Sequence, residues 1–155
     1  MTANELFSDL QSKLEEEIHV GEWLEITQDR INAFAEATGD LQWIHTDVER
    51  AESESPFGTT AAHGFLTLSL IPHLTEIINP DKPLDPDAKL IVKYGLNRVR
   101  FPSPVLVGSR LRSRTVLQNV EMLDGSIQLT SVITVELEGG NKPACVAEAI
   151  IRLYY

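Results

Sequence analysis

Three side chains and one backbone amide that could do chemistry lie between residues 40 and 64: Asp40, His45, His63 and the N–H of Gly64. Asp40 and His45 fall within ATGDLQWIHTD, residues 37–47, just after the expected end of a helix. A carboxylate and an imidazole in one loop can hold a single water, with one group taking its proton and the other supplying a proton elsewhere. An Asp after Gly also forms turns, and a His beside Trp43 is often half-buried, so spacing alone leaves both interpretations open.

His63-Gly64 precedes an apolar stretch that reads as a helix. The first amides of a helix have no internal acceptor, and a residue without a side chain lets a ligand oxygen approach them. The Gly64 N–H is therefore a candidate oxyanion donor, although Gly64 could equally serve close packing alone. His45 and His63 could be metal ligands, but no third His or Cys stands nearby to complete a zinc site, and we expect no metal.

The elements that must position these residues are helices first and strands second. Apolar spacing predicts an amphipathic helix over residues 3–17 and a second helix over 28–38, with Thr27 as its N-cap and Gly39 at its end. Residues 64–78 are apolar nearly all round, which is typical of a helix wrapped by other structure. Pro72 is expected to kink or interrupt this helix.

Four runs rich in β-branched residues follow, at 90–101, 110–117, 127–137 and 145–154. They are separated by Pro102-Ser103-Pro104 and by the turn sequences Asp124-Gly125 and Gly139-Gly140-Asn141. The order predicts an α+β fold, in which an antiparallel sheet wraps around one central helix at about residues 63–78. We expect an N-terminal helix within residues 1–18 and a single domain over residues 19–155.

The composition narrows the class of protein. A formal net charge of −10 argues against a nucleic-acid partner. The single Cys145 excludes an internal disulfide framework and is typical of a reducing compartment. The N-terminus lacks the pattern of a signal peptide, and the longest apolar run, residues 65–74, is too short to span a bilayer. We therefore expect a cytoplasmic protein without a membrane partner.

The charge is unevenly distributed along the chain. Residues 1–60 hold fourteen acids against three bases, whereas residues 93–114 hold no acid. The bases of this second segment are Lys93, Arg98, Arg100, Arg110, Arg112 and Arg114. Strand alternation would place Arg98 and Arg100 on one face of their strand. It would likewise place Arg110, Arg112 and Arg114 on one face of theirs. Such a cluster indicates either an anionic ligand or ordinary solvent-facing arginines.

The run FAEATGDLQWIHTDVERA, followed by SPFGTTAAHGFLTLSL, resembles the hydratase signature of the MaoC-like family, the (R)-specific enoyl-CoA hydratases. It is especially similar to the NodN-like branch. The matching positions are Gly39-Asp40, Ile44-His45, Asp47 and His63-Gly64, in order and spacing. YGLNRVRFPSPVLVGSRLRSR, residues 94–114, resembles two strands of the family and their connecting turn. The likeness covers most of residues 20–155.

The resemblance implies a single hot-dog domain and reversible hydration of a trans-2-enoyl thioester to a (3R)-3-hydroxyacyl-CoA. Asp40 and His45 would activate the water, and the Gly64 N–H would stabilise the thioester oxyanion. We expect further substrate contacts from His63, Arg98, Arg100 and Arg110, with the arginines meeting the phosphates of coenzyme A. No cofactor is expected, because coenzyme A is part of the substrate. A curved sheet with open edges also predicts a homodimer.

Two departures from the family pattern and two rival functions remain. Gln42-Trp43 replaces the usual Asn-Pro before Ile-His, and Pro72 stands where some members have a serine near the catalytic Asp. Ser69 is the nearest hydroxyl.

The two rival functions are an acyl-CoA thioesterase of the same fold and a non-catalytic acyl-thioester-binding subunit of a heterodimeric dehydratase. The presence of both Asp40 and His45 argues against the non-catalytic subunit.

Overall fold

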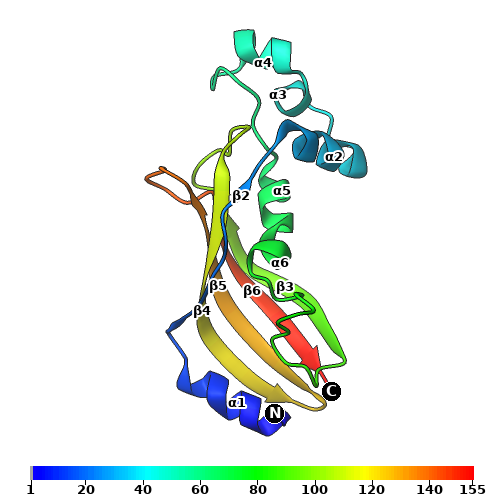
Figure 1. Ribbon diagram of the computed structural model, residues 1–155, viewed down its shortest axis with the longest axis vertical. Coiled ribbons are helices and arrows are strands. Elements are labelled where there is room, and N and C mark those ends of the chain that lie inside the picture. Colours follow the sequence, from blue (N-terminus) through cyan, green and yellow to red (C-terminus); the bar gives the residue numbers. More distant parts are fainter. Residues whose placement is uncertain (1) are drawn as a thin grey trace.

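The computed structural model describes residues 2–155, and its main feature is one curved antiparallel sheet (Figure 1). Neighbouring strands follow the order β1-β4-β5-β6-β3, and β2 also pairs with β4. The strands are β1 (Glu17–Val20), β2 (Leu24–Glu25), β3 (Leu90–Arg100), β4 (Arg110–Leu123), β5 (Ser126–Leu137) and β6 (Cys145–Tyr154). The helices are α1 (Ala3–Ser12), α2 (Gln28–Thr38), α3 (Trp43–Thr46), α4 (Val48–Glu54), α5 (Gly64–Ser69) and α6 (Ile71–Leu74).

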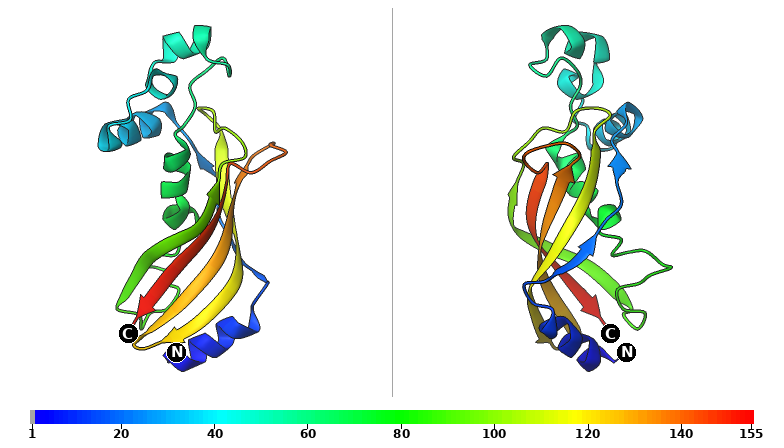
Figure 2. Two further views of the ribbon diagram at one scale, coloured as in Figure 1. Left: turned by 180° about the vertical axis from the view of Figure 1, so that it is seen from behind. Right: turned by 60° about the vertical axis from the view of Figure 1, so that its left-hand side comes forward.

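The sheet curves around α5 and α6, whereas α2, α3 and α4 lie together beyond one end of it (Figures 1 and 2). Burying the concave face against these two helices removes apolar side chains from water, the main stabilising term in folding. The largest buried cluster joins both helices to the sheet through Leu66, Leu70, Ile71, Leu74, Leu111, Ile133, Val135 and Ala147. The expected α+β fold, with an antiparallel sheet around a central helix, is confirmed.

The central helix is shorter than the expected 64–78 and is interrupted. Pro72 has no N–H and its ring displaces the carbonyl four residues earlier, so the helical path breaks at Leu70 and restarts as α6. The kink expected from Pro72 is thus confirmed. The C-terminal bound was wrong: Glu76 adopts the left-handed region at φ 51°, and Ile78 lies outside the helix with 60% of its surface exposed.

The end of α6 is fastened to the sheet through one carbonyl group. The Ser113 hydroxyl donates a hydrogen bond of 2.7 Å to the Leu74 oxygen. A Cβ at Gly21 would lie 2.2 Å from the same oxygen, so this close approach requires glycine. His19 Nε2 lies 3.3 Å from it. Residues from two distant parts of the chain, residues 19–21 and Ser113, therefore fix where the central helix ends.

The N-terminal helix also ends earlier than expected. Thr2 begins α1 with a capping box, but the helix stops at Ser12, and Glu15 adopts φ 64°. Leu14, expected on the buried face, is 37% exposed. Residues 17–20 instead form β1 beside β4, which runs to Leu123 and so exceeds its expected bound. Pairing of β1 satisfies backbone groups of β4 that would otherwise lie at a sheet edge.

No helix among residues 2–155 is long and apolar enough to cross a bilayer.

The segment after α6 lies against the concave face of the sheet. It is attached to the last residue of the chain, Tyr155, by a hydrogen bond. The Tyr155 hydroxyl donates a 2.7 Å hydrogen bond to Oδ2 of Asp85, which is only 4% exposed. Asp85 Oδ1 accepts from the backbone N–H of Asp87. Burial, and then the hydrogen bond with Asp85, raise the pKa of Tyr155 well above its ordinary value of 10.0.

Replacing Tyr155 with Phe should lower the free energy of unfolding by about 1 kcal/mol at pH 7, because a hydrogen bond to a buried carboxylate is lost. The wild-type advantage should shrink as the pH rises above about 10, where the unfolded chain begins to lose the phenolic proton that the folded state retains. Urea unfolding of both proteins between pH 7 and 11 measures this. Tyr94→Phe is the control, since that side chain is 55% exposed. Equal changes in the free energy of unfolding for the two variants would contradict the stabilising role of the Tyr155–Asp85 hydrogen bond.

Candidate active site

Local chain signals place Asp40 and His45 next to each other. The Thr27 side chain caps α2 at its start, and Gly39 ends it in the left-handed region at φ 77°. Gly39 is favoured there because L-residues with a side chain are strained at this angle. The chain then turns through Asp40 into the short helix α3, which carries His45. Asp47 accepts a hydrogen bond from the Arg50 N–H and so caps α4, which makes it a structural residue.

His45 is half-buried and held by one ring nitrogen. Its Nδ1 lies 2.6 Å from the backbone oxygen of Ala61. A carbonyl only accepts hydrogen bonds, so Nδ1 carries the proton and donates it. In the neutral ring, Nε2 then holds a free lone pair that can accept a proton from water. This fixed tautomer is the one that general-base chemistry requires.

His63 supports Asp40 from beneath. Its Nε2 lies 2.9 Å from the Asp40 backbone oxygen and 3.9 Å from the Asp40 carboxylate, and only 3% of its surface is exposed. The His63 ring stacks on that of His45, with centroids 3.8 Å apart, and contacts Phe34 on its other side. We therefore assign His63 a positioning role, which corrects the expectation of a substrate contact; a ring this buried has little surface to offer a ligand.

The Asp40 carboxylate completes the cluster and faces solvent. One ligand-type atom each of Asp40, His45 and His63 lie within 4.8 Å of one another. The Asp40 side chain is 53% exposed, whereas its backbone is fixed by His63. An exposed carboxylate close to a His45 ring whose Nε2 has a free lone pair can share one water with that ring, the arrangement expected from the sequence. The structure thus brings Asp40 and His45 together as predicted.

The same three residues could in principle ligate a metal ion, but their geometry favours hydrogen bonding. Imidazole lone pairs lie in the ring plane, and the planes of His45 and His63 are stacked at 25° to each other. Stacked rings direct their lone pairs side by side and not toward one point. One nitrogen of each ring is also engaged with a backbone oxygen. The absence of a metal cofactor stays a prediction, testable by activity after dialysis against EDTA.

Gly64 begins α5 directly after His63, and its N–H belongs to the first helical turn, which has no intrahelical acceptor. Next to it lies a cavity of about 450 Å³ whose lining includes Ala62, Gly64, Thr67 and Phe101. A Cβ at Gly64 would lie 3.3 Å from the Phe101 ring, closer than ordinary van der Waals contact. The glycine thus allows the Phe101 ring to pack closely against the start of α5, and its N–H stays a candidate oxyanion donor at the edge of this cavity.

Gln28 positions His45 and was not identified from the sequence. Its amide Nε2 donates 2.8 Å to the His45 backbone oxygen and 2.9 Å to Asn32, and its Oε1 accepts from the hydroxyl of the fully buried Thr60. Gln28 thereby ties α2, α3 and the loop before α5 together. Thr60 lies 32 residues away in the chain, so no local pattern could have indicated the pairing.

Replacing Gln28 with Ala should lower kcat by about 10–100-fold, because a displacement of the reacting group by about 1 Å has effects of that size. KM should change little, because the Gln28 side chain binds the backbone oxygen of His45 and acts only through the position of that residue. Gln28→Glu, which keeps the acceptor for Thr60 but loses the donors, should fall between. The measurement is steady-state kinetics at matched stability. A loss confined to thermal stability, with unchanged kcat, would make Gln28 purely structural.

The basic segment does not form one patch. Arg110 pairs with Glu138 at 3.2 Å, and Arg112 and Arg114 pair with Glu136, with Arg114 also reaching Glu17. These arginines share one face of β4 as expected, but their charge is neutralised. Arg98 and Arg100 lie on β3, three strand spacings (about 14 Å) from β4. Neither makes an ion pair within residues 2–155. Arg110, in contrast, is paired with Glu138, so the expectation that it contacts a phosphate is not supported.

Ser69 lies three residues before Pro72, the position at which some family members have a serine. It is the last residue of α5 and lines a second cavity together with Pro72 and Leu68. The cavity is bounded on its other side by β3 and β6. No role for Ser69 follows from its position.

Comparison with known proteins shows the family. The model of the MaoC-like domain, a dehydratase family, matches residues 9–138. The 3-hydroxyacyl-thioester dehydratase Z of Mycobacterium tuberculosis is 50% identical over 98% of both chains. Nodulation protein N of Rhizobium leguminosarum bv. viciae is 44% identical over 96% of this chain and 91% of that protein.

Among solved structures, the (R)-hydratase from A. caviae involved in PHA biosynthesis superposes with a TM-score of 0.65 at 23% identity, covering 88% of this chain and 97% of that one. This similarity concerns the fold, and it identifies the sheet around α5 and α6 as a hot-dog fold. The family match, the close relatives and the shared fold agree. The chain belongs to the MaoC-like dehydratase family.

Proposed function

We propose that this chain is an (R)-specific enoyl-CoA hydratase, which reversibly adds water to a trans-2-enoyl-CoA to give a (3R)-3-hydroxyacyl-CoA. The family makes the protein a hydro-lyase. The observation that carries the finer proposal is the His45 ring, whose Nδ1 donates to the Ala61 oxygen so that Nε2 keeps a free lone pair, and one of whose nitrogens lies within 4.8 Å of an Asp40 carboxylate oxygen. The relative that acts on a 3-hydroxyacyl thioester supports the substrate class.

The proposed reaction uses one water and no cofactor. Asp40 and His45 Nε2 hold the water, whose oxygen bonds to C3 of the enoyl group while the pair accepts its proton. Negative charge moves through the double bond to the thioester oxygen, where the Gly64 N–H stabilises it. The pair then returns a proton to C2, so that one H and one OH have been added. Because one pair serves both steps, water and proton reach the same face of the substrate.

We further propose that Arg98 and Arg100 recognise the phosphates of coenzyme A. Both are exposed on β3 and make no ion pair among residues 2–155, and together with Glu148 on the neighbouring strand they line a cavity of about 350 Å³. Arginine binds phosphate oxygens through two parallel hydrogen bonds.

The cytoplasm remains the proposed location.

A homodimer is the proposed assembly, because β3 leaves one edge of the sheet open. Exposed apolar side chains gather along this edge and the adjacent start of α5, namely Phe65 (68%), Leu90 (56%), Tyr94 (55%), Leu96 (46%) and Phe101 (41%). Exposed apolar side chains along one strand and beside it suit an interaction site. A second copy of β3 would satisfy the free backbone groups and cover these side chains together.

Light scattering should therefore give about twice the chain mass of 17.3 kDa at micromolar concentration. Leu96→Asp, which places a charge in the proposed interface, should shift the protein to the monomer, whereas Met122→Asp, at a side chain 41% exposed on β4, should not. A wild-type protein of single-chain mass would contradict the dimer.

The function is tested by following the loss of enoyl absorbance with crotonyl-CoA as substrate, and by chiral chromatography of the product. Hydration to the R product supports the proposal. Release of a free thiol, detected with a thiol reagent, would instead identify a thioesterase. A protein that binds crotonyl-CoA without turning it over would be a non-catalytic subunit.

A further inference from the structure

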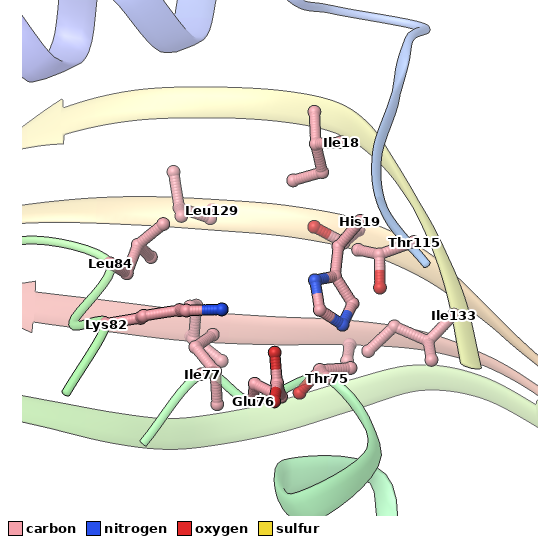
Figure 3. Close-up of a pocket in the computed structure, with 13 residues that line it drawn as sticks. Ile18, His19, Thr75, Glu76, Ile77, Lys82, Leu84, Thr115, Leu129 and Ile133 are labelled. Atoms are coloured by element: carbon pink, nitrogen blue, oxygen red, sulfur yellow. The ribbon is translucent and has the colours of Figure 1, made fainter. Parts of the chain in front are cut away.

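Another cavity, of about 240 Å³, lies on the concave face of the sheet next to the end of α6 (Figure 3). It occupies the gap between the two buried clusters of the protein. One cluster centres on α5 and α6, and the other joins Leu6 and Leu10 of α1 to Leu117, Ile127, Leu129 and Leu153. Residues from β1 and from the segment after α6 close its sides.

This cavity adjoins the one of about 300 Å³ that runs beside α5 and α6 along β3. The two share the lining residues Thr75, Ile77, Ile133, Ala149 and Ile151. Except for Thr75, all of these are apolar. A path of this shape and lining suits an extended aliphatic chain, since apolar surfaces gain free energy by leaving water together.

The inner end of the path is not apolar throughout. Thr115 lies on β4, only 6% exposed, and its hydroxyl has no hydrogen-bond partner within residues 2–155. Figure 3 shows the Thr115 side chain directed into the cavity. Leaving a buried hydroxyl unpaired costs about 1–3 kcal/mol. Valine has almost the same shape and would avoid this cost, so the hydroxyl calls for a partner that enters the cavity.

Further polar side chains face the same space: His19 from β1, and Glu76 and Lys82 from the segment after α6 (Figure 3). Thr75 and Ser131 also line the cavity. His19 Nε2 lies 3.3 Å from the Leu74 oxygen and so carries the proton in the neutral ring, which leaves Nδ1 as an acceptor. Lys82 is a donor, Glu76 an acceptor, and the Thr115 hydroxyl either. The cavity thus offers both donors and acceptors at the end of an apolar path.

We propose that this cavity binds an aliphatic chain that carries a hydroxyl group, with the hydroxyl paired to Thr115. A hydroxyl both donates and accepts, and so it matches this set of partners. A carboxylate would meet Lys82 but also the like charge of Glu76, which disfavours it. The chain has two possible sources. It is either the distal part of the acyl substrate, a reading that rests on the function proposed above, or a separate hydroxy lipid.

Direct binding tests the site without any enzyme assay. ω-Hydroxydodecanoic acid and dodecanoic acid are titrated into the full-length protein by isothermal calorimetry. The hydroxylated probe should bind about tenfold more tightly, the equivalent of one hydrogen bond of about 1.4 kcal/mol. Thr115→Val should abolish this preference and leave the affinity for dodecanoic acid unchanged. The matched control is Thr134→Val on β5, which lines the cavity beside Trp23 and not this one.

Equal affinities of the wild-type protein for the two probes, or a preference that survives in Thr115→Val, would overturn the proposal. So would binding of neither probe, since the cavity would then hold water alone. If Thr115→Val does not fold, Lys82→Met is used, and the preference for the hydroxylated probe should again decrease. The wild-type comparison decides the matter in either case.

Kinetics then separate the two sources. If the substrate chain enters the cavity, ω-hydroxydodecanoic acid should compete with long-chain enoyl-CoA but not with crotonyl-CoA. If the ligand is a separate lipid, long-chain substrates and the probe should bind together. Failure of crotonyl-CoA turnover would refute the proposed function but leave the binding result standing, so the two proposals fail independently.

Discussion

Asp40→Asn should lower kcat for crotonyl-CoA hydration by about 10²–10⁴ with KM nearly unchanged, the usual range for a general acid–base group. The asparagine keeps the size of the side chain and one oxygen, but it loses the negative charge that helps to orient and polarise the water. The backbone contact between Asp40 and His63 does not involve the replaced atoms. The fold of the turn should therefore survive, and the loss should fall on the chemical step.

His45→Gln should reduce kcat by the same order. Glutamine can still donate to the Ala61 oxygen, which now accepts from Nδ1 of the ring, but it cannot accept and return a proton. The double variant should be little worse than either single one, because groups that act on one water are non-additive. Additive losses would mean that the two side chains act on separate steps.

Circular dichroism and urea unfolding must first show that each variant folds. Asp47→Asn is the matched control, since Asp47 is a nearby carboxylate that caps α4; it should lose stability before it loses kcat. A folded Asp40→Asn protein with near-full activity would refute the proposed role of Asp40. A product of S configuration would refute the proposed R specificity.

Much of this geometry could be predicted because it depends on short-range signals. Thr27 and Gly39 mark the two ends of α2 and therefore the place where Asp40 emerges. β-branched alternation located the four long strands, and the turn sequences after β4 and β5 indicated that β4 pairs with β5 and β5 with β6. In each case the residues that determine the structure lie next to one another in the chain.

The features that sequence reasoning missed depend on contacts between distant residues. Leu74 ends the central helix because Gly21 and Ser113 meet its carbonyl, and neither is visible from the apolar pattern of residues 64–78. Arg110 reads as a free cation until folding brings Glu138 opposite it. Thr115 fits the inward side of β4, but only the assembled cavity reveals that its hydroxyl is unpaired.

The second large effect is expected at a backbone atom, the Gly64 N–H, which no ordinary side-chain change removes. Gly64→Pro removes it at little structural cost. Proline is well tolerated at the first position of a helix, where its missing N–H has no partner. His63, the preceding residue, already has φ −60° and ψ 138°, the extended conformation that proline demands of its predecessor. The helix should thus begin as before, without its first donor.

Gly64→Ala is the matched control, because it adds the same Cβ but keeps the N–H. That Cβ would lie 3.3 Å from the Phe101 ring, so both variants must shift the ring by a few tenths of an ångström. The two variants share the added Cβ and differ in the N–H and in the proline ring carbons, which face the already extended His63. Loss of one oxyanion donor should lower kcat of Gly64→Pro by about 10²–10³ relative to Gly64→Ala.

Steady-state kinetics with crotonyl-CoA measure this difference, after urea unfolding has shown comparable stability. If both variants lose activity equally, crowding against Phe101 is the cause, and adding Phe101→Leu should restore both. If Gly64→Pro alone is impaired, Phe101→Leu should not rescue it, because no side-chain change can return the missing hydrogen. A Gly64→Pro enzyme as active as Gly64→Ala would show that the charge on the thioester oxygen is stabilised elsewhere, and the start of α5 would then serve packing alone.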